Sequence, residues 1–318
     1  MVSVNVYDKE GIEVVSTVSK PDLFDVELRS DLVRRTYDNV RQNSRQPYAV
    51  SPLAGKQHSA ESWGTGRAMA RVPRVKASGT RRAGQAAFAN FARKGRMAHP
   101  TKTHRRWHKK TPLNLRRLVT LMGVAASGNV GLVEGRGHRV GNVKSLPLVV
   151  SDSVAEIKKT KEAEKMIKNL NLGDELDRVK KSKTITCGKG KFRGRRYNMR
   201  TGMLIVHSEK TLSAFASIKG VELANVEQLN LLRLCPGGQL GRLIVWTESA
   251  FKRLETLFTE SKKGFELPNK MVTEENLQEY FYAPEVQALL KVPRLLPHDT
   301  CHKSEDDKKL MHEMIAMW

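Results

Sequence analysis

Two glycine-rich stretches are the first places in the chain where the residue types could bind phosphate. One has glycines at positions 188, 190 and 194, and the other at positions 135, 137 and 141. Both read G-x-G-x-x-x-G, one residue longer than the dinucleotide-binding pattern, in which a strand leads into the glycines and a helix follows. The sequence also lacks a G-x-x-x-x-G-K-[ST] phosphate loop and a G-x-S-x-G nucleophile elbow. Neither a nucleotide-dependent enzyme nor a serine hydrolase is therefore predicted.

Other residues with catalytic or metal-binding chemistry stand in unfavourable surroundings. Asp174 and Glu175 are adjacent, but they lie in a charged stretch, and we expect both to be solvated rather than catalytic. Two further groups could hold a metal: His99, His104 and His108, and His298, Cys301 and His302. Cations surround the first group and would repel a metal ion, and the second lacks the usual spacing of zinc ligands. We expect no catalytic residues, no metal site and no cofactor.

The positive charge of the chain is confined to two segments. The 318 residues carry a net charge of +23, from 56 Lys and Arg against 33 Asp and Glu. Residues 48–110 hold 15 Lys and Arg and one acid, Glu61, and residues 178–200 hold 10 Lys and Arg and no acid. The remaining residues together are close to neutral. Because a generally basic surface would spread its charge, this distribution indicates two sites that bind a polyanion.

The first basic segment has an unusual texture. Glycine and small residues alternate with Arg and Lys, and no helical or strand periodicity persists. A compact domain seldom contains about 60 structureless residues, so this segment should fold onto another molecule. Trp63, Phe88, Phe91 and Trp107 are interleaved with the cations. Aromatic rings can stack on unpaired bases while Arg and Lys bind phosphates, which predicts a long excursion into a large RNA.

The rest of the chain alternates short apolar runs with amphipathic stretches. The expected strands are residues 2–7, 147–151, 202–207, 221–223 and 242–247. The expected helices are residues 22–42, 112–127, about 154–170 after a capping box of Ser153 and Glu156, 210–217, 226–234, 248–258 with Thr247 as N-cap, and about 273–290 before a mobile end. This alternation predicts an α/β fold with a mainly parallel sheet flanked by helices, a long inserted extended basic loop and a C-terminal tail. The expected division is a discontinuous globular domain of residues 1–47 plus 111–262, a loop of residues 48–110 and an extension of residues 263–318.

Several longer stretches resemble one known family. RQPYAV at 45–50, SAESWGTGR at 59–67 and PTKTHRRWH at 100–108 are similar to the universal ribosomal large-subunit protein four family in its eukaryotic form. LPLVV at 146–150, GKGK at 188–191, NLLRL at 230–234, PGG at 236–238 and WTESAF at 246–251 resemble the same family in the same order. The resemblance runs from the N-terminal strand to about residue 295.

The resemblance implies a structural role in the ribosome. It implies a globular α/β domain on the outside of the large subunit and a loop that penetrates the rRNA to the constriction of the polypeptide exit tunnel. The implied tunnel-lining residues are Trp63, Gly64, Thr65, Gly66, Arg67, Arg71 and Arg74, and Arg67 is the foremost candidate for a tunnel-facing charge. Bacterial members have a basic residue where Trp63 stands.

Residues expected to bind rRNA lie in both basic segments. In the first they are Lys56, Lys76, Arg81, Arg82, Phe88, Phe91, Arg93, Lys94, Arg96, Lys102, Arg105, Arg106, Trp107, Lys109 and Lys110. In the second they are Lys189, Lys191, Arg193, Arg195, Arg196 and Arg200.

The expected function is to bind and organise rRNA, line the tunnel constriction and support translation and subunit assembly. The expected partners are large-subunit rRNA, neighbouring large-subunit proteins and the nascent polypeptide. Structural ions bound to the rRNA are compatible with these contacts, and no membrane partner is expected. The expected location is the cytoplasmic ribosome, with assembly in the nucleus or nucleolus of a eukaryote. Two alternatives remain open: an RNA-modifying enzyme with a basic RNA-binding arm, and a chromatin or DNA-packaging protein.

Overall fold

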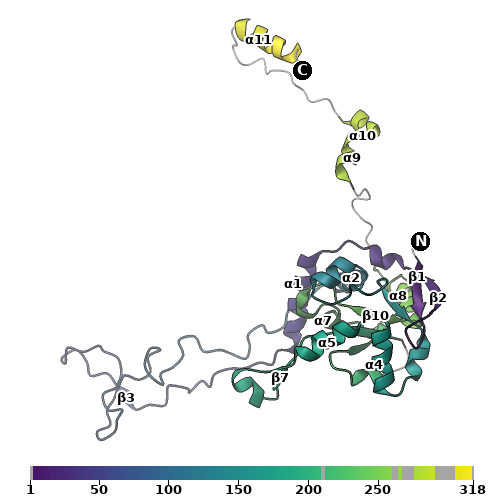
Figure 1. Cartoon of the computed structure of the whole chain (residues 1–318). Coiled ribbons are helices and arrows are strands. Elements are labelled where there is room, and N and C mark those ends of the chain that lie inside the picture. The colour runs from purple at the N-terminus through teal and green to yellow at the C-terminus, as the bar shows by residue number, and fades with distance from the viewer. Residues whose placement is uncertain (1–2, 209–211, 260–263, 267–275, 291–304, 317–318) are drawn as a thin grey trace. The chain divides into compact units, whose positions relative to one another are not determined.

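A sheet of six strands forms the centre of the first of two compact units, Met1–Asn269. The computed structural model describes residues 3–208, 212–259, 264–266, 276–290 and 305–316. The strand order is β2-β1-β5-β10-β8-β9 (Figure 1). The strands are β1 (Ser3–Tyr7), β2 (Val14–Ser19), β5 (Leu148–Val150), β8 (Leu204–His207), β9 (Glu222–Asn225) and β10 (Ile244–Thr247). β1 pairs antiparallel with β2, and every other neighbouring pair is parallel, so the predicted α/β fold with a mainly parallel sheet is confirmed.

Side chains alternate between two hydrophobic cores, one on each face of the sheet. Val149 and Trp246 point into one core and Val150 and Val245 into the other. Such alternation is what period-2 strands buried on both faces require. Each fully buried large apolar side chain contributes about 1.5–3 kcal/mol relative to an exposed one. Trp246 is among the largest fully buried side chains, so β10, one of the two middle strands, contributes strongly to the first core.

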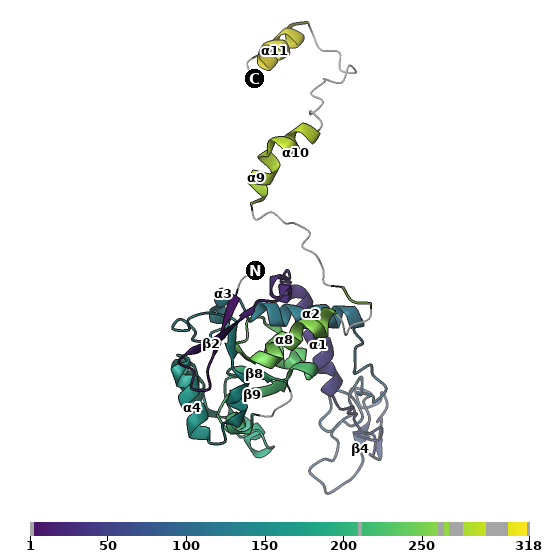
Figure 2. The ribbon, with the colours of Figure 1, turned by 90° about the vertical axis from the view of Figure 1, so that its right-hand side faces the viewer.

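Helices cover both faces of the sheet (Figures 1 and 2). The first core receives side chains from α1 (Ser30–Arg41), α2 (Leu113–Ala126), α7 (Leu231–Leu234) and α8 (Glu248–Thr259). The second core receives side chains from α3 (Val130–Gly135), α4 (Thr160–Asn169), α5 (Gly173–Lys181) and α6 (Ser213–Ala216). Short 3-10 helices join them: η1 (Asp22–Asp25), η2 (Gln42–Ser44), η3 (Asp152–Glu156), η5 (Val226–Gln228) and η6 (Pro236–Gly238).

Several helices expected to be continuous are divided in the structure: residues 154–170 are split between η3 and α4, and two further segments show the cause. Residues 22–42 form η1 and α1, because Val26 is extended (φ −66°, ψ 138°) and separates them. Residues 226–234 form η5 and α7, because Leu229 is extended (φ −61°, ψ 123°). The apolar spacing was helical in both segments, but the extended residues between the turns also pack against the core. Of the expected helix 210–217, residues 210–211 lie outside the described residues and α6 covers Ser213–Ala216.

The two predicted helix caps are wrong. The Ser151 side chain, not Ser153, accepts a hydrogen bond from a backbone N–H, that of Ser153, and the helix beyond begins at Thr160. The Thr247 hydroxyl is buried and has no hydrogen-bond partner within the described part of the chain. Asp152 accepts from the Ser249 N–H instead, at 3.2 Å. The start of α8 is therefore capped from η3, which is distant in sequence and cannot be read from local spacing.

Two segments of the first unit pair only with themselves. Residues 48–110 contain a two-stranded sheet of β3 (Ala60–Glu61) and β4 (Arg74–Val75). Residues 184–198 form a second small sheet of β6 (Thr184–Ile185) and β7 (Tyr197–Asn198), with η4 (Gly188–Phe192) between them. Neither hydrophobic core contains a residue from 48–110. The basic loop, residues 48–110, and the small sheet of β6 and β7 therefore lie outside the two hydrophobic cores, whereas Val179, in the α5 part of the second basic segment, is buried.

The second compact unit, Lys270–Trp318, is helical where it is described. It contains α9 (Leu277–Tyr282), α10 (Pro284–Leu289) and α11 (Glu305–Ala316). The predicted helix near 273–290 corresponds to α9 and α10, and residues 305–316 form a helix where a mobile end was expected. None of the helices in the described ranges is long and apolar enough to cross a bilayer.

Candidate nucleic-acid interface

The basic loop, residues 48–110, is held together by its own backbone. Ala60 pairs with Val75 and Glu61 with Arg74, and Arg74 bridges to Ala86 on a third arm. The Val75 N–H donates to Gln85 O at 3.0 Å, and the Ala87 N–H donates to Pro73 O at 2.8 Å. Ala87 is fully buried although it lies in the loop. Residues 60–87 thus form a small ordered tip rather than an open coil.

Two arms of the loop also touch nearer its base, and glycine permits the contact. A Cβ at Gly55 would lie 2.5 Å from the Arg96 nitrogen, and a Cβ at Gly95 would lie 1.9 Å from the Ala89 oxygen. Real Cβ atoms do not approach backbone atoms so closely, so only glycine fits here without a shift of the chain. The Gly55 contact joins residues 41 apart in sequence and narrows the loop where its arms meet, whereas the Gly95 contact lies within one arm.

The tip gathers three of the predicted tunnel-lining residues. The Arg67 guanidinium carbon lies 4.5 Å from the centre of the Trp63 ring, and that of Arg74 lies 5.4 Å from it. Gly84 faces the rim of the same indole, since a Cβ there would lie 3.3 Å from Trp63 Cη2. Arg74 Nη1 donates to Gly84 O at 3.1 Å. A cation–π contact of this kind is worth about 0.5–1 kcal/mol at an exposed site and orients the guanidinium.

The other predicted tunnel-lining residues are exposed. Gly64, Thr65, Gly66 and Arg71 all face solvent. Gly64 has φ +73° and the Ala68 N–H donates to Thr65 O at 3.2 Å, so the chain turns sharply between Trp63 and Arg67. This turn brings the Arg67 side chain back onto the indole.

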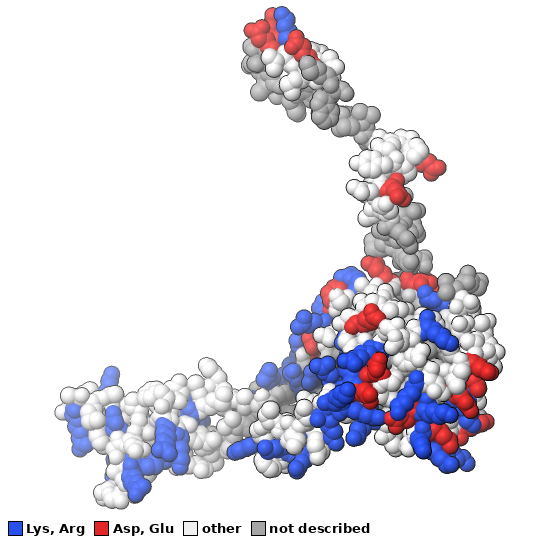
Figure 3. All heavy atoms as spheres, in the orientation of Figure 1, with Lys and Arg blue, Asp and Glu red and all other residues white. Residues whose placement is uncertain are grey.

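The loop cations predicted to bind rRNA are placed for phosphate contact, with two exceptions. Lys76 forms an ion pair with Glu61, the single acid of the loop, and Arg82 is half-buried and donates to Arg93 O at 3.3 Å. The exposed ones with no carboxylate partner among the described residues are Lys56, Arg81, Arg93, Lys94, Arg96, Lys102, Arg105, Arg106, Lys109 and Lys110. In the view of Figure 3 the loop accordingly shows Lys and Arg but no Asp or Glu.

The aromatic residues of the loop differ in exposure. Phe91 is 76% exposed, whereas Phe88 is half-buried with its ring 5.9 Å from that of His58. Trp107 is buried: its indole N–H donates to Thr103 O at 2.8 Å, and its ring lies 4.9 Å from that of Tyr48. Arg105 lies over the Trp107 ring at 5.2 Å. Trp107 therefore organises the base of the loop and orients a neighbouring cation.

The second basic segment forms a hairpin, residues 183–200, whose predicted cations are all exposed. They are Lys189, Lys191, Arg193, Arg195, Arg196 and Arg200. The hairpin also exposes Phe192 by 80% and Tyr197 by 56%. These two rings were not predicted to bind RNA. Like Phe88 and Phe91, however, they are aromatic residues that stand among cations in the sequence, and the same pattern could have identified them.

A buried carboxylate anchors the base of this hairpin. Glu175 on α5 has no exposed surface; it accepts hydrogen bonds from Arg178 Nη2 at 2.6 Å and from His138 Nδ1 at 2.7 Å. Burial by itself raises the pKa of Glu175, but the hydrogen bonds from Arg178 and His138 outweigh it and lower the pKa to about 2. Arg178 also donates to Thr201 O at 3.4 Å, where the hairpin ends. The expectation that Glu175 is solvated was wrong, whereas Asp174 is exposed.

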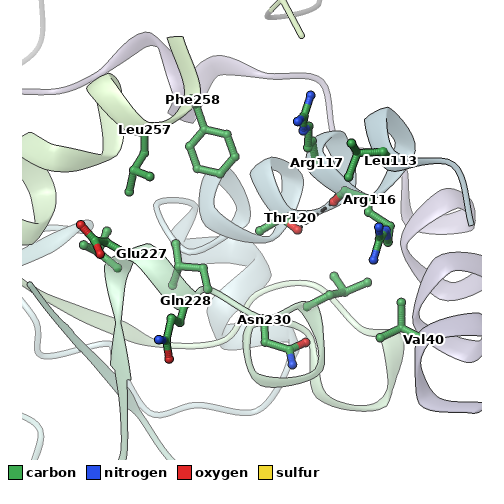
Figure 4. A pocket seen from close by; sticks show the side chains of 13 residues that line it. Val40, Leu113, Arg116, Arg117, Thr120, Glu227, Gln228, Asn230, Leu257 and Phe258 are labelled. Carbon is green, nitrogen blue, oxygen red and sulfur yellow. Dashed lines mark hydrogen bonds between the residues drawn. The ribbon is translucent and has the colours of Figure 1, made fainter. Parts of the chain in front are cut away.

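One pocket, of about 510 Å³, opens beside α1, α2, η5 and α8 (Figure 4). Its wall combines Leu113 and Phe258 with Arg116 and Glu227. The Thr120 hydroxyl is bonded to Arg116 O at 2.8 Å. Its thirteen lining residues include no Ser, Cys or His, so the nucleophile–base pairs of common hydrolases are missing from it.

A smaller cavity of about 200 Å³ lies at the carboxyl ends of β5, β8 and β10. This edge of a parallel sheet is where α/β enzymes usually bind their ligands. Ser249 donates to Asp152 at 2.7 Å and shares a hydrogen bond with Ser208 at 2.9 Å, so Asp152 caps α8.

Cys235 is buried against Gly123, and burial raises the pKa of its thiol to about 12. In the ranges that the structure describes, no three His, Cys, Asp or Glu side chains converge as metal ligands; His298, Cys301 and His302 lie outside those ranges.

Comparison with known proteins agrees with this arrangement. Large ribosomal subunit protein uL4 of Trypanosoma brucei brucei is 46% identical over 302 residues, which cover 93% of this chain and 81% of that protein. Large ribosomal subunit protein uL4B of Schizosaccharomyces pombe is 44% identical over 297 residues, covering 91% and 82%. The uL4 of Prunus armeniaca is 46% identical over 283 residues, covering 86% and 69%. The model of the ribosomal protein L4/L1 family matches residues 18–257, so the chain belongs to the ribosomal protein L4/L1 family.

Proposed function

We propose that this chain is a structural constituent of the large ribosomal subunit that binds rRNA through the basic loop and the hairpin. The carrying observation is that the exposed cations of the basic loop, residues 48–110, and of the hairpin, residues 183–200, lack carboxylate partners in the described structure, apart from the Lys76–Glu61 pair. A structural role follows from family membership, and the RNA-modifying enzyme has no support from the relatives. Its partners are large-subunit rRNA and neighbouring ribosomal proteins, and its place is the cytoplasmic ribosome.

The Lys and Arg side chains of the loop bind mainly to the phosphates of the rRNA backbone. Each Lys or Arg that neutralises a phosphate releases condensed counterions, which drives binding and makes it sensitive to salt. The close arms at Gly55 and Gly95 suit a narrow passage between RNA helices. Phe91, and Phe88 to a lesser degree, are placed to stack on unpaired bases, and Trp107 acts by holding Arg105 in place. In this proposal, residues 1–47 plus 111–262 form the globular domain, residues 48–110 form the loop, and residues 263–318 form the C-terminal extension.

The tip of the loop lines the exit tunnel, with Arg67 as the charge that faces the nascent chain. The support is the family membership together with the exposure of Gly64, Thr65, Gly66 and Arg71. Trp63 then acts as a positioning residue, since its ring holds the Arg67 guanidinium at 4.5 Å and that of Arg74 at 5.4 Å.

Sedimentation of a cell lysate at low and then high salt tests the ribosomal role. We expect the chain to co-sediment with the large subunit and to remain there at high salt, because many of its contacts are enclosed by RNA. A surface protein held by charge alone would be stripped. Release into the light fractions would contradict an integral role and bring back the RNA-modifying enzyme.

Ribosome profiling of an Arg67→Ala strain tests the tunnel assignment. We expect altered passage of nascent chains at nearly normal subunit yield, since one exposed side chain contributes little to assembly. Met69→Ala is the matched control, because Met69 is an exposed, uncharged residue of the same tip. A deficit of subunits with normal elongation would show that Arg67 serves assembly instead.

A further inference from the structure

The basic hairpin, residues 183–200, exposes two aromatic rings that electrostatic binding alone does not require. Phe192 is 80% exposed and Tyr197 is 56% exposed. A large apolar ring that is exposed to water gains none of the stabilisation that burial would give it. Phosphate contacts would be equally strong with any small residue at these positions. The rings therefore point to a partner that offers a flat apolar face.

Each ring has a cation beside it. Lys183 Nζ lies 4.0 Å from the centre of the Tyr197 ring, and Lys191 Nζ lies 5.3 Å from the centre of the Phe192 ring. No acidic residue occurs between positions 178 and 200. A nucleotide presents a base face next to a phosphate, so a ring paired with an ammonium group complements both of its parts.

The rings are mounted on an ordered support. β6 and β7 pair Ile185 with Tyr197, and the Thr186 N–H donates to Arg196 O at 2.8 Å. At the base, the Arg200 N–H donates to the Ser182 hydroxyl at 3.0 Å, and Arg178 links Thr201 O to the buried Glu175. Because the hairpin is already folded, ordering it on binding costs little of the affinity.

We propose that the hairpin captures unpaired rRNA nucleotides by stacking them on Phe192 and Tyr197, while its Lys and Arg bind the flanking phosphates. The inference rests on the proposed rRNA-binding function and adds the form of RNA that this segment selects. Bases in an RNA duplex are stacked on one another, and the deep major groove keeps side chains from their edges, so a duplex offers the rings nothing. The hairpin should therefore prefer single strands, independently of the loop.

The test compares the full chain with a Phe192→Leu/Tyr197→Leu variant in binding to a labelled 12-mer of oligouridylate and to a 12-base-pair RNA duplex. Base–aromatic stacking is worth about 1–3 kcal/mol per base, so each ring removed should weaken oligouridylate binding roughly 5- to 150-fold. Duplex binding should stay within about twofold. Met199→Ser is the matched control, since Met199 is 37% exposed on the same hairpin but has no ring and lies outside β6 and β7.

A second variant separates this inference from the proposed function. Arg195→Ala/Arg196→Ala removes two phosphate contacts and should weaken the binding of both RNAs. If it does so while the leucine variant binds oligouridylate normally, the hairpin binds RNA without stacking and the inference is wrong. If neither variant changes binding, the hairpin is not an RNA-binding element, and that part of the proposed function fails as well.

A crosslink in the assembled subunit provides the direct readout. With p-benzoylphenylalanine in place of Phe192, irradiation should attach the chain to an rRNA nucleotide that is not base-paired. Attachment to a duplex nucleotide or to a neighbouring protein would overturn the inference, and the latter would make the ring a protein contact.

Discussion

A single buried carboxylate, Glu175, fixes the junction between α5 and the basic hairpin. Replacing it by Gln would leave the Arg178 guanidinium and the His138 ring without their shared anion. Breaking a buried pair in this way typically costs about 3–5 kcal/mol, so we expect Glu175→Gln to lower the free energy of unfolding by about 3 kcal/mol at neutral pH. Chemical denaturation of the full chain measures this. Asp174→Asn, at the exposed neighbour, should change it by less than about 0.5 kcal/mol.

The pH dependence of the same variant gives its control. The pKa of Glu175 falls from an ordinary value of 4.5 to about 2 on folding. The carboxylate therefore stabilises the fold fully above pH 4.5, and this stabilisation is lost as the pH falls from 4.5 towards 2. The gap in stability between the wild type and Glu175→Gln should close over that range. A gap that persists at pH 2 would mean that packing, not charge, accounts for the loss.

The fate of individual residues shows how far sequence reasoning reaches. Phe91 and the exposed loop cations could be identified as RNA-binding candidates because their chemistry is visible in composition alone. The burial of Glu175 could not be predicted, because its partner His138 lies 37 positions away and only the folded chain brings them together. Trp107 was selected for its type, but whether an indole faces solvent or a neighbour such as Tyr48 is decided by tertiary packing.

At the scale of elements, the parallel strands of the central sheet were predicted more accurately than the helices, whereas β2 and the short strands β3, β4, β6 and β7 were not predicted. The apolar runs at β5, β8 and β10 have one interpretation, because a strand buried on both faces must be apolar throughout. The segment 22–42 has two interpretations. The spacing of Leu23, Phe24 and Val33 fits one continuous helix, and it fits equally well a 3-10 turn followed by an extended stretch and α1. Core packing of the extended residues, which local spacing does not encode, selects the divided form.

The contact between the arms of the loop depends on Gly55. A Cβ there would meet the Gly95 carbonyl carbon and the Arg96 nitrogen at 2.5 Å, so Gly55→Ala should push the arms apart. We expect tryptic cleavage near Arg93 and Arg96 to become roughly tenfold faster, equivalent to about 1.4 kcal/mol of easier local opening. Gly79→Ala is the matched control, because Gly79 also has a positive φ (+82°) and a Cβ there meets nothing within 4 Å. Equal cleavage rates in both variants would refute the steric argument.

Deleting residues 60–85 should leave the rest of the first unit folded. Neither hydrophobic core contains a residue between 48 and 110, so the deletion removes no core packing. We expect the free energy of unfolding to change by less than about 1 kcal/mol, within the range of surface changes, as measured by denaturation with circular dichroism. Unfolding of the truncated chain would show that the loop boundary is wrongly drawn.

At the scale of the whole molecule, it is the placement of charge that separates binding surface from scaffold. The excess of +23 comes entirely from residues 48–110 and 178–200, and the remainder of the chain is close to neutral. The distribution of charge along the sequence was therefore enough to nominate the segments that we propose bind RNA. It could not show that the loop has an ordered tip or that the hairpin is anchored through Arg178, because both depend on contacts between distant residues.

The salt dependence of RNA binding should follow this placement rather than net charge. On single-stranded RNA each phosphate contact contributes about −0.7 to the slope of log K against log salt concentration, so Arg195→Ala/Arg196→Ala should make the slope less negative by about 1.4. Lys158→Ala/Lys161→Ala lowers the net charge by the same amount, but both lysines are exposed outside the basic segments. That variant should keep the wild-type slope when affinity for oligouridylate is measured between about 50 and 200 mM salt. Local contacts predict a change in slope only where the removed cation touches a phosphate. If both variants make the slope less negative by the same amount, long-range attraction by the whole molecule governs binding instead.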